Sequence, residues 1–243
     1  MAFTKQINIL GIPFNDIDFN QAQNILERLV RRGRRNHVVV TPNPEGVMQA
    51  QRNACFSSAL KSADLVLADG TGIYMAAKYL RTPLPGRVRG IDTALALFKR
   101  LGAGGGCTVY LLGARPGVAK RAKSNLEAHY PGVKVIGLHH GFFEDDAAII
   151  NEINALSPDI LLVCTGMPRA EIWAHKNKTL NARLTMCLGG TIDVLAGEVN
   201  LAPWFLRKIG LEWLYRLAMQ PSRAARMLDI PRFIIAVLRG PRS

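Results

Sequence analysis

Long apolar runs and paired cysteines are both missing from this 243-residue chain. No apolar run reaches the roughly 20 residues that a membrane-spanning helix requires. The first ten residues place no basic segment before a long apolar stretch, so we expect no secretory signal. The four cysteines form no CxxC pair, and three of them lie in apolar runs. They indicate buried, reduced thiols rather than disulfides or a metal site.

Common catalytic and metal-binding signatures are absent too. The chain contains no GxSxG, HExxH or P-loop pattern, and its five histidines show no ligand spacing. The glycines at 104–106 precede a predicted strand instead of following one, which excludes a dinucleotide-binding loop. Because 49% of the residues are hydrophobic, a disordered protein is excluded as well.

The charge is strongly one-sided. The chain has 31 Lys and Arg against 18 Asp and Glu, a net charge of +13. Such an excess predicts an anionic partner, whether nucleic acid, anionic lipid or a phosphate-rich substrate. Residues 203–243 contain eight basic side chains against Glu212 and Asp229. The arginines of residues 28–35 close a predicted helix, where cations offset the helix macrodipole whatever the function.

Apolar, β-branched segments alternate with amphipathic ones, which predicts an α/β fold with a mostly parallel, Rossmann-like sheet flanked by helices. The strand candidates are residues 7–10, 37–40, 64–68, 108–112, 133–138, 159–165 and 184–188. The helix candidates are residues 20–32, 44–52, 71–80, 92–101, 116–129, 145–156 and 169–180. Ligands of such sheets bind beyond the carboxyl ends of the strands, so we expect the site in the turns that follow them.

The alternation ends after Gly197, and we predict no further strand beyond it. Residues 204–219 and 222–238 are expected to form two helices, broken at Pro221 and Pro231 because proline interrupts a helix interior. Both segments are rich in aromatic and aliphatic residues interspersed with arginine.

This change divides the chain into an α/β catalytic domain, residues 1–200, and a basic, amphipathic helical appendage, residues 201–243. Large apolar side chains next to cations favour docking of the appendage on an anionic membrane surface. Packing against the sheet domain would bury the same apolar groups, so that alternative stays open.

One acidic turn stands out for its chemistry. Asp69 directly follows a predicted apolar strand and is flanked by glycines in the Asp69 turn (residues 69–72). Shielding by the sheet raises the basicity of a carboxylate, as a general base requires. Asp69 or Thr71 could equally cap the helix that follows, and composition leaves both interpretations open.

Two other patterns have structural explanations that we favour. Asp16 and Asp18 match a spacing that holds divalent metals in many sugar-nucleotide enzymes, but they precede the first helix, where aspartate caps free N–H groups. Residues 111–117 run from a strand through Gly113 into a helix whose N-terminus could hold a phosphate. Many α/β turns look the same, so a purely structural role is favoured there.

Taken together, these turns resemble the WecG/TagA/CpsF glycosyltransferases (glycosyltransferase family 26). The resemblance covers about residues 7–233 and rests on eight motifs in order: residues 41–45 (TPNPE), 69–72 (DGTG), 87–92 (RVRGID), 111–113 (LLG), 141–143 (GFF), 166–173 (GMPRAEIW), 189–193 (GGTID) and 211–217 (LEWLYRL). It implies a membrane-associated, inverting enzyme of the bacterial cell envelope. Such an enzyme moves a sugar from a UDP-sugar to a polyprenyl-diphosphate-linked acceptor in polysaccharide biosynthesis.

The resemblance also implies roles for particular residues. Asp69 is expected to be the catalytic base, and no metal or other cofactor is expected. The residues expected to bind the donor are Thr41, Asn43, Arg87, Gly113, Glu171 and Asp193. The residues expected to bind the acceptor and the diphosphate are Arg216, Arg223 and Arg226.

The chain departs from the family pattern at two places. Ala170 stands where the family usually has Gln in a Pro-x-Gln-Glu motif, and residues 200–203 (NLAP) replace Lys-Arg-Ala-Pro. Loss of the Gln amide removes both donors and acceptors of hydrogen bonds from the pocket. The N-acetylmannosamine donor of several members is therefore in question, and a plain hexose such as glucose becomes an alternative.

Three classes of function compete: a glycosyltransferase, a basic nucleic-acid-binding module, and an inactive family member that serves as a membrane scaffold. No DNA- or RNA-binding signature occurs, so we expect no nucleic-acid partner. The intact Asp69 turn favours an active enzyme over a scaffold. We expect a peripheral protein on the cytoplasmic face of the plasma membrane, and whether it forms a homo-oligomer is left open.

Overall fold

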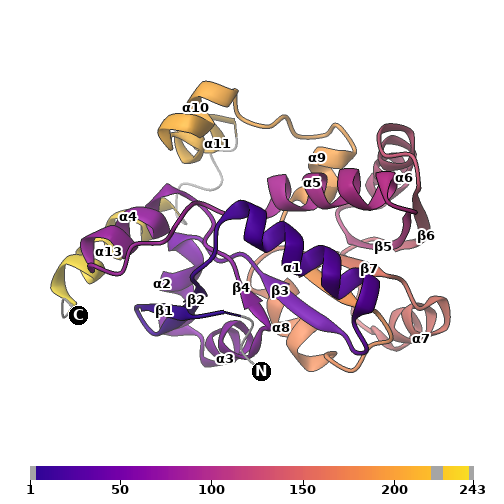
Figure 1. The fold of residues 1–243 in the computed structure, drawn as a ribbon, viewed down its shortest axis with the longest axis horizontal. Coiled ribbons are helices and arrows are strands. Elements are labelled where there is room, and N and C mark those ends of the chain that lie inside the picture. Colours follow the sequence, from indigo (N-terminus) through magenta and orange to yellow (C-terminus); the bar gives the residue numbers. More distant parts are fainter. Residues whose placement is uncertain (1–3, 220–226, 241–243) are drawn as a thin grey trace.

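A six-stranded, all-parallel sheet lies at the centre of the structure, a computed structural model that describes residues 4–219 and 227–240 (Figure 1). Its strands follow the order β4-β3-β8-β7-β5-β6. Their bounds are β3 His37–Val40, β4 Leu65–Val66, β5 Cys107–Gly113, β6 Val133–His139, β7 Ile160–Cys164 and β8 Leu184–Cys187. The predicted α/β class and its parallel sheet are confirmed.

The strands are almost continuously apolar because helices cover both faces of the sheet. Along β7, for example, every residue is buried. Leu161 and Val163 face one helical layer, while Ile160 and Leu162 face the other. Cys107, Cys164 and Cys187 are buried free thiols within these layers, as predicted, whereas Cys55 is exposed.

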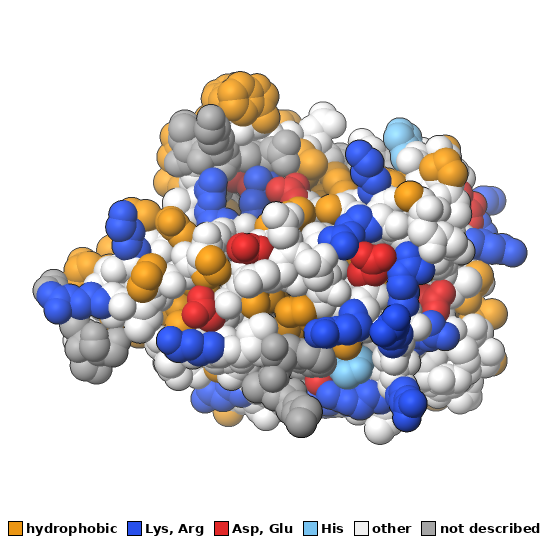
Figure 2. Space-filling view, in the orientation of Figure 1, with side chains coloured by type: hydrophobic (Ala, Val, Ile, Leu, Met, Phe, Trp, Pro, Cys, Tyr) orange, Lys and Arg blue, Asp and Glu red, His pale blue; other side chains and the backbone are white. Residues whose placement is uncertain are grey.

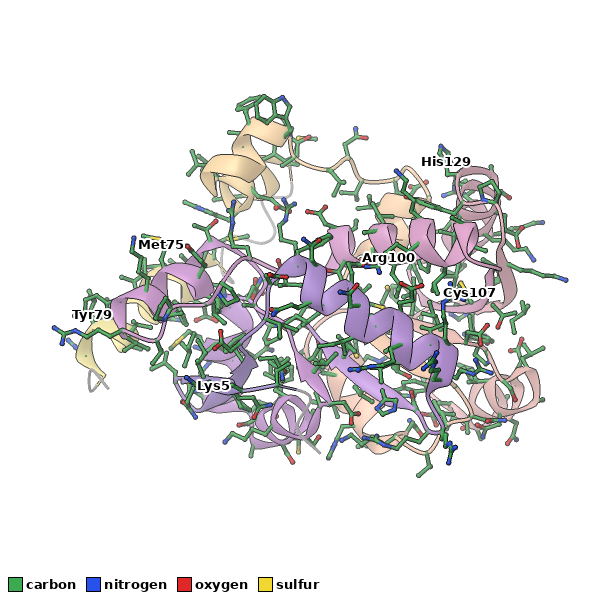
Figure 3. The ribbon with its side chains drawn as sticks, viewed as in Figure 1. Lys5, Met75, Tyr79, Arg100, Cys107 and His129 are labelled. Carbon is green, nitrogen blue, oxygen red and sulfur yellow. The ribbon has the colours of Figure 1, made fainter. Side chains whose placement is uncertain are left out.

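Each face has its own set of helices (Figure 1). One face is covered by α1 Phe19–Arg32, α5 Gly90–Ala103, α6 Val118–His129 and α9 Thr191–Leu195. The other face is covered by α2 Pro44–Arg52, α3 Ala54–Ser62, α4 Thr71–Tyr79, α7 Ala147–Leu156, α8 Arg169–Lys176 and α13 Asp229–Arg239. Arg100 on α5, labelled in Figure 3, donates a hydrogen bond to Asn24 of the adjacent α1 at 2.8 Å.

A small hairpin completes the second face. It pairs β1 Gln6–Ile9 with β2 Ile12–Asn15 in antiparallel register, and Leu10 and Gly11 form its turn with positive φ angles. Two-residue turns with positive φ suit the twist of a hairpin. We predicted only the first strand. The second contains Pro13, which a strand tolerates at an edge, as in this two-stranded sheet.

The first helix settles the role of one acidic residue. The Asp18 carboxylate accepts a hydrogen bond from Gln21 N at 2.8 Å, and the Gln21 side chain accepts one from Asp18 N at 2.9 Å. This capping box satisfies two backbone N–H groups at the N-terminus of α1, those of Asp18 and Gln21. The favoured interpretation of Asp18 as a cap is confirmed.

The C-terminal region differs from the prediction. Gly210 separates α10 Trp204–Ile209 from α11 Glu212–Met219, while Pro221 lies outside the described residues. The predicted break at Pro231 is wrong, because Pro231 lies in the first turn of α13, where its missing N–H has no intrahelical partner to lose.

The last helix belongs to the same hydrophobic core as the sheet. Phe233 and Val237 are buried where α13 packs on α2 and α4. Asp229 accepts two hydrogen bonds from Arg52 of α2, at 2.9 and 2.5 Å. Residues 201–243 are therefore not established as a separate appendage, and the boundary at residue 200 stays a prediction.

We expect Asp229→Asn to loosen α13 from the body. The Arg52 guanidinium holds the pKa of Asp229 below its usual value, so the pair stabilises the folded state above the unfolded pKa of about 4. That stabilisation is lost as the pH falls through the lower, folded pKa. Because Arg52 is half-exposed, we expect a loss of about 1 kcal/mol at neutral pH, disappearing in acid.

The measurement is hydrogen exchange of the α13 amides together with urea unfolding. Glu198→Gln, which breaks the more exposed pair with Arg121, is the control and should change neither. Equal exchange in Asp229→Asn and the parent at pH 7 would show that the pair does not hold α13.

Candidate active site

The carboxyl ends of β3, β4 and β8 bring three turns into close contact. A Cβ atom added to Gly72, in the Asp69 turn, would lie 2.5 Å from Pro44 Cγ in the turn after β3. One added to Gly90, at the start of α5, would lie 2.9 Å from both Thr41 Oγ1 and Leu188 Cδ2. The turn after β3 that contains Thr41, the Asp69 turn and the start of α5 therefore share one site, in the position expected for an open α/β sheet.

Asp69 is half-buried in this site and directly precedes the first residues of α4. Gly70, with φ +89°, is the N-cap residue of α4. Neither Asp69 nor Thr71 therefore takes the N-cap position, as the capping alternative expected. The carboxylate lies at a strand end with a helix N-terminus behind it, a position from which it can take part in chemistry.

Arg87 lies beside the same turn. Its Nη1 donates a hydrogen bond to Thr71 Oγ1 at 2.8 Å. Val88 N donates to Ala68 O at 3.0 Å, which ties this loop to the residue before Asp69. The structure thus brings the predicted base and the predicted phosphate ligand together from separate segments of the chain.

Thr41 and Asn43 also have local structural partners. Asn43 Oδ1 accepts a hydrogen bond from Gly46 N at 2.9 Å and so caps α2. Thr41 Oγ1 reaches Cys187 O at 3.5 Å, the long limit for a hydrogen bond. Both side chains are half-buried at the strand ends. They are held in place by backbone groups of the site.

Gly113 and Asp193 belong to other parts of the same sheet edge. Gly113 ends β5 with φ +148°, and a Cβ there would lie 2.5 Å from Cys164 O of β7. This close approach gives Gly113 the structural role that we favoured. Asp193 lies in the first turn of α9, after β8, and its backbone oxygen accepts from Glu198 N at 2.9 Å. Because β5, which ends at Gly113, is four strand spacings from β4, which precedes Asp69, the two strands lie roughly 19 Å apart at about 4.8 Å per strand.

Glu171 is more deeply buried than a simple donor contact requires. It is 7% exposed, and its Oε2 atom has no hydrogen-bond partner among the described residues. Burial raises the pKa of this carboxyl to about 7. Ala170 beside it is fully buried, so a longer side chain there would have to displace its neighbours. The donor-binding role of Glu171 stays a prediction.

Sequence reasoning missed the residues that organise the loop after β6. Arg169 donates to Gly141 O at 2.8 Å and to Phe143 O at 2.7 Å, and its guanidinium lies 4.5 Å from the Phe143 ring centroid. Trp173 Nε1 donates to Asp146 at 2.6 Å. Both residues lie in the 166–173 motif, but sequence spacing alone does not reveal their partners.

The predicted acceptor-binding arginines are only partly covered. Arg216 belongs to α11, but its side chain lies outside what the structure describes, as do Arg223 and Arg226 entirely. The start of α11 nevertheless reaches the site, because Glu212 pairs with Arg89 at 2.8 Å. Sequence reasoning included both residues in motifs without foreseeing this pair.

Neither a metal cluster nor a membrane-spanning helix is found in the described ranges. Residues 4–219 and 227–240 contain no group of three or more His, Cys, Asp or Glu that could hold a metal ion. Among the same residues, none of the helices has both the length and the apolar character to cross a bilayer. Metal independence itself stays a prediction.

Comparison with known proteins shows the family of the chain. Residues 7–243 match the model of the "Glycosyl transferase WecG/TagA/CpsF family". A Bacillus spizizenii protein named N-acetylglucosaminyldiphosphoundecaprenol N-acetyl-beta-D-mannosaminyltransferase is 33% identical over 241 residues, covering 99% of this chain and 93% of the relative. A Staphylococcus aureus (strain MW2) protein of the same name is 31% identical over 244 residues, covering 99% and 95%. The chain therefore belongs to the WecG/TagA/CpsF family and is a glycosyltransferase.

Proposed function

We propose that this enzyme moves a sugar from a UDP-sugar to a polyprenyl-diphosphate-linked acceptor, with Asp69 as general base and without a metal. The observation that carries the proposal is the Asp69 turn. Asp69 lies at a strand end, and Arg87 donates a hydrogen bond to Thr71 of the same turn. A base and a phosphate ligand side by side match the two needs of glycosyl transfer from a nucleotide.

In the proposed reaction the acceptor hydroxyl attacks the anomeric carbon from the face opposite UDP. A bond forms from the acceptor oxygen to the anomeric carbon as the bond to the UDP oxygen breaks, so the configuration inverts. Asp69 takes the hydroxyl proton. A positioned base of this kind contributes about 10²–10⁴-fold to the rate.

The leaving diphosphate needs positive charge as it departs. Arg87 supplies a planar guanidinium, whose paired N–H groups suit phosphate oxygens. We assign the remaining neutralisation to Arg216, Arg223 and Arg226, as the family resemblance implies. In this scheme the arginines replace a divalent cation.

The names of the relatives guide the choice of substrates. They describe transfer of N-acetylmannosamine to an N-acetylglucosaminyl diphosphoundecaprenol. We propose an acceptor of this class in bacterial cell-envelope polysaccharide synthesis. Because Ala170 replaces the usual Gln and is buried, the donor sugar is left as a hexose or an N-acetylhexosamine.

We also propose that the enzyme works as a peripheral protein on the cytoplasmic face of the plasma membrane. Trp204, Phe205, Trp213 and Leu214 of α10 and α11 are exposed, at 67%, 51%, 40% and 47%. Figure 2 shows hydrophobic side chains at the outer end of this helix pair. Aromatic groups on a strongly basic protein suit an anionic lipid surface, where a lipid-linked acceptor resides.

We expect Asp69→Asn to abolish transfer, by at least about 100-fold in kcat, because the amide keeps the volume but cannot accept a proton. UDP affinity, measured by calorimetry, should stay within about threefold of the parent. Asp145→Asn, at an exposed loop position, serves as the control and should retain full turnover. Near-parental turnover in Asp69→Asn would refute the general-base role.

Chelation provides a separate test of the metal-free scheme. Purified enzyme treated with EDTA should release UDP at an unchanged rate, because arginines neutralise the diphosphate in the proposed reaction. Activity that falls with EDTA and returns with magnesium or manganese would overturn metal independence. Such a result would leave glycosyl transfer itself standing.

The membrane role can be tested with a paired substitution. Trp204→Ser with Phe205→Ser should lower sedimentation with anionic liposomes by tenfold or more, since each inserted aromatic contributes roughly 1.5–3 kcal/mol. Phe142→Ser, which removes a 66%-exposed aromatic from the loop after β6, is the matched control and should bind normally. Equal binding by all three proteins would exclude α10 as the docking element.

A further inference from the structure

The turn between α10 and α11 lies directly on the Asp69 turn. Gly210 forms this turn with φ +85°, and its N–H donates to Leu206 O. A Cβ added to Gly210 would lie 2.9 Å from both Cβ and Cγ2 of Thr71, and closer still to Thr71 Oγ1. Only a glycine permits both this backbone conformation and this approach.

A second contact ties the start of α11 to the start of α5. The carboxylate of Glu212 lies 2.8 Å from Arg89 Nη2, and the two side chains are only 20% and 14% exposed. Arg89 Nη1 also lies 3.3 Å from Asp92. This pair is far better shielded than the surface pair of Arg121 and Glu198, at 53% and 37%. Its attraction is therefore screened less by water and salt.

Thr71 links these contacts to the chemistry. Its side chain meets Gly210, and its hydroxyl accepts the hydrogen bond from Arg87. Helices α10 and α11 lie beyond the two helical layers (Figure 1), and none of their described side chains belongs to either core layer. The helix pair α10 and α11 thus contacts Thr71, the residue whose hydroxyl holds the predicted phosphate ligand Arg87.

We propose that Gly210 and Glu212 are positioning residues for the transfer reaction. Together they form a latch, Gly210 on Thr71 and Glu212 on Arg89, that holds α10 and α11 across the Asp69 turn and fixes Arg87 against the donor diphosphate. The inference rests on the proposed function and adds to it the segment of the chain, α10 and α11, that positions the Asp69 turn. Opening the latch leaves Asp69 in place but lets Thr71 and Arg87 relax.

The main experiment compares two glycines with similar backbones. Gly210→Ala introduces strain at φ +85° and a clash with Thr71, whereas Gly197→Ala introduces strain at φ +77° with nothing within 4 Å. The difference between these variants isolates the contact from the backbone effect. Gly210→Ala should lower kcat by about tenfold or more, because misplacement of a positioning group by about 1 Å can cost up to about 100-fold. Gly197→Ala should keep at least about half of the parental kcat.

The second comparison concerns the ion pair. Glu212→Gln should lower kcat with little change in the donor KM, while Glu198→Gln, which breaks the exposed pair with Arg121, should change neither. If both latch residues act through one docked helix pair, the double variant Gly210→Ala with Glu212→Gln should be no slower than the slower single variant. Additive losses would contradict a single latch.

Hydrogen exchange supplies a readout that does not depend on turnover. Amides of residues 204–219 and 87–89 should exchange faster in Gly210→Ala than in Gly197→Ala. Normal exchange with lost turnover, or faster exchange with normal turnover, would overturn the positioning role. If the parent enzyme transfers no sugar, the proposed function fails, and the exchange pattern alone then decides whether the latch exists.

Discussion

The burial of both faces of a parallel sheet is the constraint on which the rest of this structure depends. Because helices cover each face, polar side chains can leave the sheet only at the strand ends. At the strand ends the turns also pack closely on one another, as Gly72 does against the Pro44 ring and Gly90 against the Thr41 side chain. Close packing and the hydrogen bonds of Asn43 and Thr71 therefore hold the active-site turns in place.

The sheet and the site were largely predictable for the same reason. Strands buried on both faces are read directly from apolar runs, and the turns after them indicated Asp69 as a candidate, while Thr41 and Asn43 were candidates through the family resemblance. The predictions that failed concerned local secondary structure. β2 contains a proline that only its edge position tolerates, and Pro231 lies in the first turn of a helix instead of breaking one.

The remaining features depend on contacts between distant segments, which composition cannot reveal. Which residue occupies the N-cap position of α4 depends on backbone conformation, and Gly70 occupies it. Glu171 stands in the expected motif, but motif spacing could not show that its side chain is buried or that burial raises the pKa of its carboxyl. The pairing of Arg89 with Glu212 joins residues more than a hundred positions apart.

The packing of α13 has a consequence for how members of this family could exchange their C-terminal ends. This helix packs Phe233 and Val237 against α2 and α4, whose first residues form the active-site turns. In a chimaera joined near residue 200, the C-terminal helix of another family member would have to pack into the hydrophobic core of this protein. Recombination that preserves the enzyme must therefore exchange α2, α4 and α13 together. The C-terminal helix is thus expected to evolve with the helices that it contacts and not as an independent module.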